Sequence, residues 1–361
     1  MNRFRIIVLT MLLLTAPIQA AEDTGILAPD AFQKQVEAKG GRCDFLFGND
    51  RPFKQCHAST VLDAGNGELL CAWFGGTQER NPDVAIWLSR FSNGAWSAPR
   101  SVAKISPMAH WNPVLFRDAE GTVYLFFKVG KTEPVWKTYW QQSNDNGATW
   151  SAAVELVPGD TGGRGPVKNK PIILSNGTWL AGASTELHKD VPFADCSTDR
   201  GKTWTRSEDW VIDKKALWGS GAIQPTVWES PAGKVHALLR SNGGRIWRSD
   251  SEDFGKTWSP IRATELPNNN SGIDLLRLED GRLLLVYNPI GKDEGARTPL
   301  DLAVSPDNGA TWKPFAHLEN DPDPETEYSY PAIVRTKSGI AISYTWRRER
   351  IRCWQIPLDA L

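Results

Sequence analysis

The sequence predicts an all-β protein, a six-bladed β-propeller whose blades each hold four antiparallel strands. Three observations lead to this prediction: a turn motif that recurs at constant spacing, strand-like runs before its copies, and the lack of long helix-like patterns after residue 40. Repeats of roughly 40–50 residues that hold about four strands are typical of propeller blades.

The turn motif reads Ser-x-Asp-x-Gly-x-Thr-Trp, and each copy begins 54 residues after the previous one. The complete copies are residues 143–150, 197–204, 251–258 and 305–312. A further copy, residues 89–96, keeps the serine and the tryptophan but has lost the aspartate. In such a turn the Asp carboxylate accepts backbone N–H groups, the glycine supplies a positive φ, and the tryptophan covers apolar surface. One hairpin turn is therefore expected in each repeat.

Related strand-like runs open six successive blades. They are residues 57–62, 111–116, 170–174, 224–228, 271–275 and 330–334. The sixth blade, residues 328–357, is one strand short, so we expect it to borrow its last strand from the N-terminal part of the mature chain. Closure of this kind removes an exposed sheet edge. A single propeller domain over residues 21–361 follows.

Residues 1–20 have the pattern of a secretory signal peptide. Arg3 and Arg5 precede an apolar run over residues 6–18, and the small residues Ala20 and Ala21 follow. The run is shorter than the roughly 20 residues that a membrane-spanning helix needs. We therefore expect a secreted or periplasmic protein that is not inserted in a membrane after cleavage.

Charge and cysteine content indicate few partners. A formal net charge of −1 gives no electrostatic reason to expect nucleic acid. The glycines of residues 162–165 lack the spacing of a phosphate-binding loop, and no pair of the five cysteines has metal-ligand spacing. We expect a monomer without metal or cofactor. Cys43 and Cys56 are either bridged or free, and the sequence leaves both alternatives open.

The repeats resemble the Asp-box (BNR) repeats of sialidases, and the chain is similar to an atypical bacterial branch of that family. The resemblance covers nearly the whole mature chain and implies a sialidase-like propeller. It includes the runs CHASTVL (56–62), WNPVLF (111–116), KNKP (168–171), NSGID (270–274) and YSYPA (328–332). The boxes are specific for the fold but weak for function, because in this family they lie at outer turns, away from the central channel.

The resemblance implies candidates for the carboxylate grip and the nucleophile of a sialidase. Sialidases hold the substrate carboxylate with three arginines, and Arg240 and Arg297 match the second and third of them. The tyrosine nucleophile corresponds to Tyr328 or to Tyr330, because both fit the Tyr-Ser signature region comparably. Arg side chains suit this role, since a guanidinium can bind a carboxylate through two parallel hydrogen bonds.

The remaining positions depart from the family pattern or leave alternatives. Residues 77–83 correspond to the acid/base region, with Glu79 and Asp83 as the candidates. His57 stands in place of the first arginine and would titrate near neutrality. Gln224 stands in place of the glutamate that activates the tyrosine, and a glutamine cannot take a proton from a phenol of ordinary pKa near 10.

The resulting functional prediction is an exo-glycosidase of sialidase-like type that acts on a terminal acidic sugar of a glycan. Lys170 and Asn112, on the third and second inner strands, are expected to add substrate contacts. Two alternatives stay open. One is a polysaccharide lyase or rhamnosidase-type propeller that uses His57 or a tyrosine on uronate-containing glycans, and the other is a propeller that binds glycans without turnover.

Overall fold

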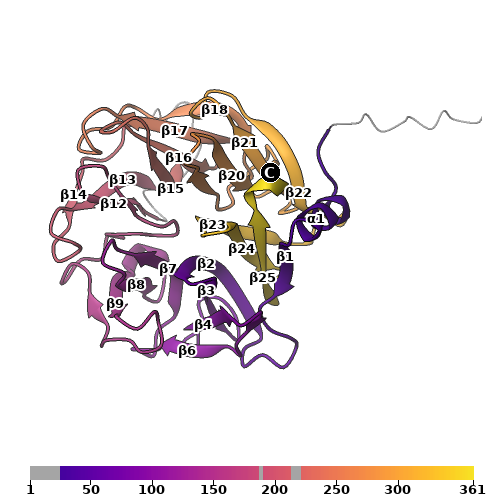
Figure 1. Ribbon diagram of the computed structural model, residues 1–361. Coiled ribbons are helices and arrows are strands. Elements are labelled where there is room, and N and C mark those ends of the chain that lie inside the picture. The colour runs from indigo at the N-terminus through magenta and orange to yellow at the C-terminus, as the bar shows by residue number, and fades with distance from the viewer. Residues whose placement is uncertain (1–24, 187–189, 213–220) are drawn as a thin grey trace, which may run out of the picture.

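The computed structural model describes residues 25–186, 190–212 and 221–361, so the predicted signal peptide lies outside the described residues. These residues form six antiparallel sheets that stand as blades around a common axis, as Figure 1 shows. The predicted fold class is confirmed. In the described part of the chain, no helix is both long and apolar enough to cross a membrane.

Blades one to three follow the chain from the inner strand outward. Blade one holds β2 (Gln55–Gly65), β3 (Glu68–Gly76) and β4 (Ala85–Ser92), and β5 (Ala95–Trp96) and β6 (Arg100–Ala103) share its outer position. Blade two consists of β7 (His110–Arg117), β8 (Val123–Val129), β9 (Lys137–Ser143) and β10 (Val154–Glu155), with a short helix, η1 (Glu133–Val135), between β8 and β9. Blade three consists of β11 (Ile172–Ile173), β12 (Trp179–Thr185), β13 (Val191–Ser197) and β14 (Thr205–Arg206).

Blades four to six complete the ring. Blade four holds β15 (Ala222–Glu229), β16 (Val235–Ser241), β17 (Arg245–Ser251) and β18 (Arg262–Pro267). Blade five holds β19 (Asp274–Arg277), β20 (Leu283–Tyr287), β21 (Leu300–Ser305) and β22 (Lys313–Glu319). Blade six holds β23 (Tyr328–Arg335), β24 (Gly339–Trp346), β25 (Arg350–Pro357) and, as its last strand, β1 (Arg42–Phe45), and the chain ends in η2 (Leu358–Ala360).

The N-terminal part of the chain closes the ring. Strand β1 pairs antiparallel with β25, and Cys43 lies opposite Trp354. The borrowed last strand of blade six is therefore confirmed. Helix α1 (Pro29–Ala38) precedes β1 and buries Phe32 and Val36 against blades five and six. The Phe32 ring stacks on Trp354 with 5.3 Å between centroids, which fixes the helix over the closure.

The core fills the spaces between neighbouring sheets. Buried side chains of blades one and two, such as Leu70 and Leu115, form one cluster. Cys56, Cys71 and Cys353 lie in another, between blades six and one. All five cysteines are free thiols, so no bridge joins Cys43 to Cys56. Buried free cysteines behave as small apolar side chains, which fits these positions.

The predicted hairpin turns connect the third and fourth strands of the blades, far from the axis. In the first complete box, Ser143 donates to Asp145 over 2.6 Å and accepts the N–H of Gly147. Asp145 also accepts the N–H and the hydroxyl of Thr149. In the degenerate box the aspartate is missing, and the buried hydroxyl of Ser89 finds no partner among the described residues. The repeat thus specifies local turns.

The inner strands share a second device, a β-bulge near their beginning. Strands β2, β7, β15 and β23 each shift register over a few residues there. The bulged residue has a positive φ in each strand, at Ala58, Asn112, Gln224 and Tyr330. This conformation is costly for a residue other than glycine, and such bulges re-aim side chains, often at functional sites. The bulges mark one end of the axis as the candidate site.

A buried ionic cluster ties the blades together along the axis. Lys170 of blade three donates to the Asp274 carboxylate of blade five over 2.9 Å. The same carboxylate accepts the Thr226 hydroxyl of blade four and the backbone N–H of Ile333 of blade six. Lys168 adds hydrogen bonds from blade three to backbone carbonyls of blades five and six. Four blades therefore meet at one carboxylate.

We predict that Asp274→Asn lowers the free energy of unfolding by about 3 kcal/mol, because Asp274 is buried and its loss leaves the partly buried Lys170 ammonium without its counter-charge. Asp280→Asn is the matched control, since the Asp280 side chain is 51% exposed and belongs to the same blade. Urea denaturation followed by tryptophan fluorescence measures both variants. Equal midpoints for the two would contradict the assigned role of Asp274.

Candidate functional site

The inner-strand bulges place a tyrosine and a histidine side by side at one end of the axis. The ring centroids of Tyr330 and His57 are 4.3 Å apart. Arg240, near the end of β16, donates from Nη1 to the Tyr330 hydroxyl over 2.7 Å. The Arg297 guanidinium lies 5.8 Å from the Tyr330 ring centroid. The structure thus brings together four of the predicted site residues, each from a different blade.

Arg240 is oriented by several acceptors besides the tyrosine. Its guanidinium donates to the Gln224 side-chain oxygen over 3.3 Å and to the side chain and backbone of Asn270. The residue is buried, so its charge acts in surroundings of low polarity and is strongly felt. Gln224 in turn donates from Nε2 to Glu186 Oε1 over 3.1 Å. Gln224 therefore links Arg240 to a carboxyl group of blade three.

Glu327, the residue before β23, joins the charged groups on the other side of the tyrosine. Its carboxylate pairs with Arg297 over 2.7 Å and with Arg348 over 2.8 Å. Burial opposes its ionisation, but the interactions with His57 and with the two guanidinium groups outweigh burial and hold the pKa of the Glu327 carboxyl well below its usual range. Arg348 also pairs with Glu79. An alternating chain of charges therefore runs from Arg297 to Glu79.

The environment of His57 favours its neutral form. Burial lowers the pKa of its imidazole well below the usual range, and Arg348, Arg297 and Arg240 lower it further, while Glu327 opposes them. Its Nδ1 is buried, lies 3.8 Å from Glu327 Oε1 and makes no hydrogen bond within the described ranges. The expectation that His57 titrates near neutrality is wrong, because the sequence reveals neither that the ring is buried nor that arginines of other blades surround it.

Other predicted site residues are engaged elsewhere. The Tyr328 hydroxyl bonds to Asp321 over 3.3 Å and its ring lies in the core of blades five and six. Asp83 accepts the backbone N–H and the hydroxyl of Thr77, which makes it the cap of its own loop. Lys170 is bound by Asp274, as described above. Asn112 lies buried at the bulge of β7.

Three charged residues of the site were not found by sequence reasoning: Glu186, Glu327 and Arg348. Glu327 directly precedes the Tyr-Ser signature, and Arg348 belongs to the charged run of residues 347–350, so each carried a weak local signal. Glu186 follows β12 without any such signal. All three come from loops that meet only when the ring closes. In the described ranges, no group of three His, Cys, Asp or Glu side chains is arranged to hold a metal ion.

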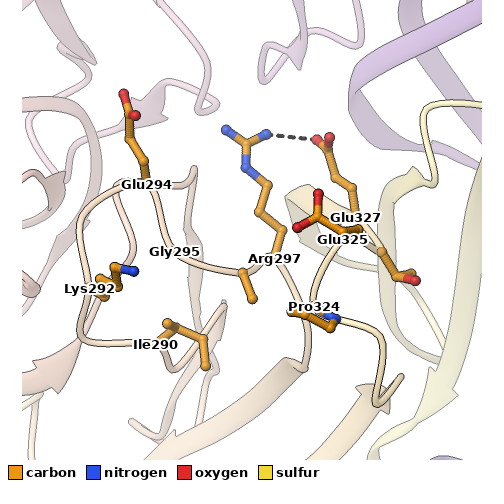
Figure 2. A pocket seen from close by; sticks show the side chains of 10 residues that line it. Ile290, Lys292, Glu294, Gly295, Arg297, Pro324, Glu325 and Glu327 are labelled. Carbon is orange, nitrogen blue, oxygen red and sulfur yellow. Dashed lines mark hydrogen bonds and ion pairs between the residues drawn. The ribbon is translucent and has the colours of Figure 1, made fainter.

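A pocket of about 570 Å³ opens beside these residues, and Figure 2 shows its lining. The Arg297 guanidinium turns toward Glu327 across the pocket, and the two interact. The pocket is formed by two loops, residues 290–297 and 324–327, and carries both charges. Its other charged side chains are Lys292, Glu294 and Glu325. Such a lining suits a polar ligand, and Arg297 connects it to Tyr330.

Comparison with protein families identifies the architecture independently of the geometry. The model of the BNR repeat-like domain matches residues 67–342. The chain belongs to this family. Membership in the BNR repeat-like family agrees with the predicted resemblance and with the turns found in the structure. No curated protein matches the chain.

Solved structures share the propeller of this BNR repeat-like chain at low sequence identity. The Hadza microbial sialidase Hz136 has a TM-score of 0.72 and 16% identity over 89% of this chain and 69% of its own. The K499G mutant of the NanB sialidase from Streptococcus pneumoniae has a TM-score of 0.71 and 13% identity over 87% and 70%. A protein of unknown function from Dyadobacter fermentans has a TM-score of 0.68 and 18% identity over 86% and 96%. These similarities establish the fold alone.

The pKa values of two histidines of this chain are predicted to be shifted in opposite directions, that of His57 downward and that of His317 upward. His57 should titrate well below its usual value of about 6.5, whereas the hydrogen bond that His317 donates to the Asp301 carboxylate raises the pKa of His317 above that value. Imidazole NMR signals recorded against pH measure both in one sample, and a His57→Gln variant assigns the first. A His57 signal that titrates at or above the His317 signal would contradict the described environment.

Proposed function

We propose that this chain is an exported glycan-active enzyme, an exo-glycosidase that removes a terminal acidic sugar. The observation that carries the proposal is the contact between the Tyr330 hydroxyl and Arg240 at the axis, with Arg297 beside the same ring. Two of the structurally similar proteins are named sialidases, which supports the same class of substrate. The signal-like pattern of residues 1–20 supports export.

The carboxylate of the sugar is bound by Arg240 and Arg297. Both arginines are held in place by protein acceptors, so little conformational entropy is lost when the substrate binds. Tyr330 lies between them and faces the anomeric carbon, where its oxygen stabilises the positive charge of the transition state. Glycosidases that employ a tyrosine in place of a carboxylate are a known exception to the two-carboxylate rule. The pocket beside Arg297 receives the remainder of the glycan.

Elimination is the second candidate function, and one observation favours it. His57 is neutral and its ring lies against Tyr330, so it is in the protonation state that a general base requires. In a lyase reaction the base would remove the proton next to a uronate carboxylate held by the arginines. The product would be an unsaturated sugar that absorbs ultraviolet light.

Product analysis distinguishes these functions. The mature protein is incubated with a panel of sialosides and uronate-rich oligosaccharides, and products are identified by mass. Hydrolysis adds one water per cleaved bond, whereas elimination adds none. We expect released acidic monosaccharide. Binding to the panel without any turnover would contradict both reactions and leave a glycan-binding protein.

We predict that Tyr330→Phe reduces kcat/KM at least about a hundredfold, because it removes the oxygen that faces the anomeric carbon. Tyr328→Phe removes the neighbouring tyrosine hydroxyl, which bonds to Asp321, and should keep activity within about threefold of wild type. Initial rates on the substrate that the panel identifies measure both variants. The reverse order of the two effects would move the assignment to Tyr328.

We predict that Arg240→Ala abolishes turnover while the fold is kept. The loss should exceed about a hundredfold in kcat/KM, since one arm of the carboxylate grip and the contact with Tyr330 disappear together. Arg245→Ala is the matched control, because Arg245 lies on the next strand of the same blade with a half-exposed side chain. Thermal unfolding verifies that both variants are folded. Undiminished activity of a folded Arg240→Ala protein would exclude the proposed grip.

A further inference from the structure

We propose that Glu186 is the general acid of this site and donates a proton to the oxygen of the leaving group. The inference rests on the proposed glycosidase function and adds a residue from a blade that contributes none of the predicted catalytic groups. Two observations support it. The Glu186 carboxyl group is linked to Tyr330 through Gln224 and Arg240, and the two other candidate acids, Glu79 and Asp83, are bound by neighbouring residues.

Glu186 follows β12, so it projects from the end of the second strand of blade three. Its Oε1 accepts Gln224 Nε2 over 3.1 Å and the Ser184 hydroxyl over 3.3 Å. Ser184 also accepts the backbone N–H of Gln224, which ties the carboxyl group to the bulge of β15 from both sides. Gln224 contacts Arg240, and Arg240 contacts Tyr330. The carboxyl group is thus two side chains away from the tyrosine, and part of the residue remains exposed.

Glu79 and Asp83, the acid/base candidates expected from the sequence, are both bound by neighbouring residues. Glu79 is paired with Arg348, so its carboxylate is already engaged by a guanidinium group. Asp83 accepts two hydrogen bonds from Thr77, and burial is outweighed by these bonds so that its pKa lies below the usual range. Asp83 therefore does not hold a proton near neutral pH. A general acid must hold one before the bond breaks.

The surroundings of Glu186 instead favour the protonated form of its carboxyl group. Burial raises the pKa of its carboxyl group to about 7, and Asp190 raises it further, whereas Arg240, the bond from Gln224 and Lys128 lower it. This environment therefore favours the protonated form of Glu186 near neutrality. A carboxylic acid with a raised pKa is the arrangement that glycosidases require of their proton donor.

The proposed step is balanced within one catalytic cycle. The Glu186 proton passes to the glycosidic oxygen as the bond from that oxygen to the anomeric carbon breaks, and the bonding electrons stay with the departing alcohol. The Glu186 carboxylate then takes a proton from a water molecule whose oxygen bonds to the anomeric carbon. The sugar leaves with a new hydroxyl group, and the acid form of Glu186 is restored.

The leaving group provides the test. A general acid is needed for a sugar alcohol but hardly for 4-methylumbelliferone, which departs readily as an anion. Glu186→Gln should therefore lower kcat/KM about a hundredfold or more for the oligosaccharide and by less than about threefold for the 4-methylumbelliferyl glycoside of the same acidic sugar. A purely positioning role would lower both equally.

Three comparisons complete the experiment. Glu252 is exposed and lies on an outer turn of blade four, so Glu252→Gln should leave both rates unchanged. For wild type, kcat/KM on the oligosaccharide should fall as pH rises above about 7, and this fall should be absent in Glu186→Gln. Glu186→Asp is the substitute if Glu186→Gln folds poorly. Because it keeps a carboxyl group, it should retain part of the wild-type kcat/KM on the oligosaccharide.

The outcomes separate the two proposals. Turnover of neither substrate by wild type would overturn the proposed function itself. If wild type turns over the substrates, two results would overturn the role of Glu186 alone. One is an equal loss of kcat/KM on both substrates in Glu186→Gln. The other is a loss confined to the oligosaccharide in Glu79→Gln instead.

Discussion

The ring depends on one buried carboxylate. Asp274 binds Lys170 of blade three, the Thr226 hydroxyl of blade four and the Ile333 N–H of blade six, so one side chain from blade five fixes the relative positions of four blades. Sheets that pack face to face can slide, because apolar contacts are not directional. Hydrogen bonds to a single charge are directional, and they help to place the bulges at the axis, where Tyr330 and Gln224 both contact Arg240.

Scaffold and chemistry are supplied by different parts of each blade. The Asp boxes form turns far from the axis, and their serine, aspartate and threonine bond to one another within eight residues. The bulges lie at the opposite part of the blade, at the beginning of the inner strand, and break the pairing there. A repeated local motif can therefore be retained while the bulged residue varies, as Ala58, Asn112, Gln224 and Tyr330 do.

The sequence was sufficient to predict what depends on local pattern. The constant spacing predicted the blades, the missing strand predicted the role of β1, and the absent aspartate identified the copy in which Ser89 stays unpaired. It was insufficient for what depends on ring closure. Glu186, Glu327 and Arg348 come from three loops distant in the chain. The lowered pKa of His57 follows from burial at the axis, with smaller contributions from arginines of three blades. No local pattern records such distances.

The charge balance of the site follows from these long-range contacts. Three guanidinium groups, of Arg240, Arg297 and Arg348, face two paired carboxylates, of Glu327 and Glu79, which leaves one positive charge in excess. His57 in its neutral form and Glu186 in its protonated form, the forms that burial favours, add no charge to this set of groups. On the proposed function, the positive charge of this set would face the carboxylate of the ligand, while Lys292, Glu294 and Glu325 line the adjoining pocket. If His57 stands where the family has an arginine, as the resemblance implies, this set of groups carries one positive charge fewer.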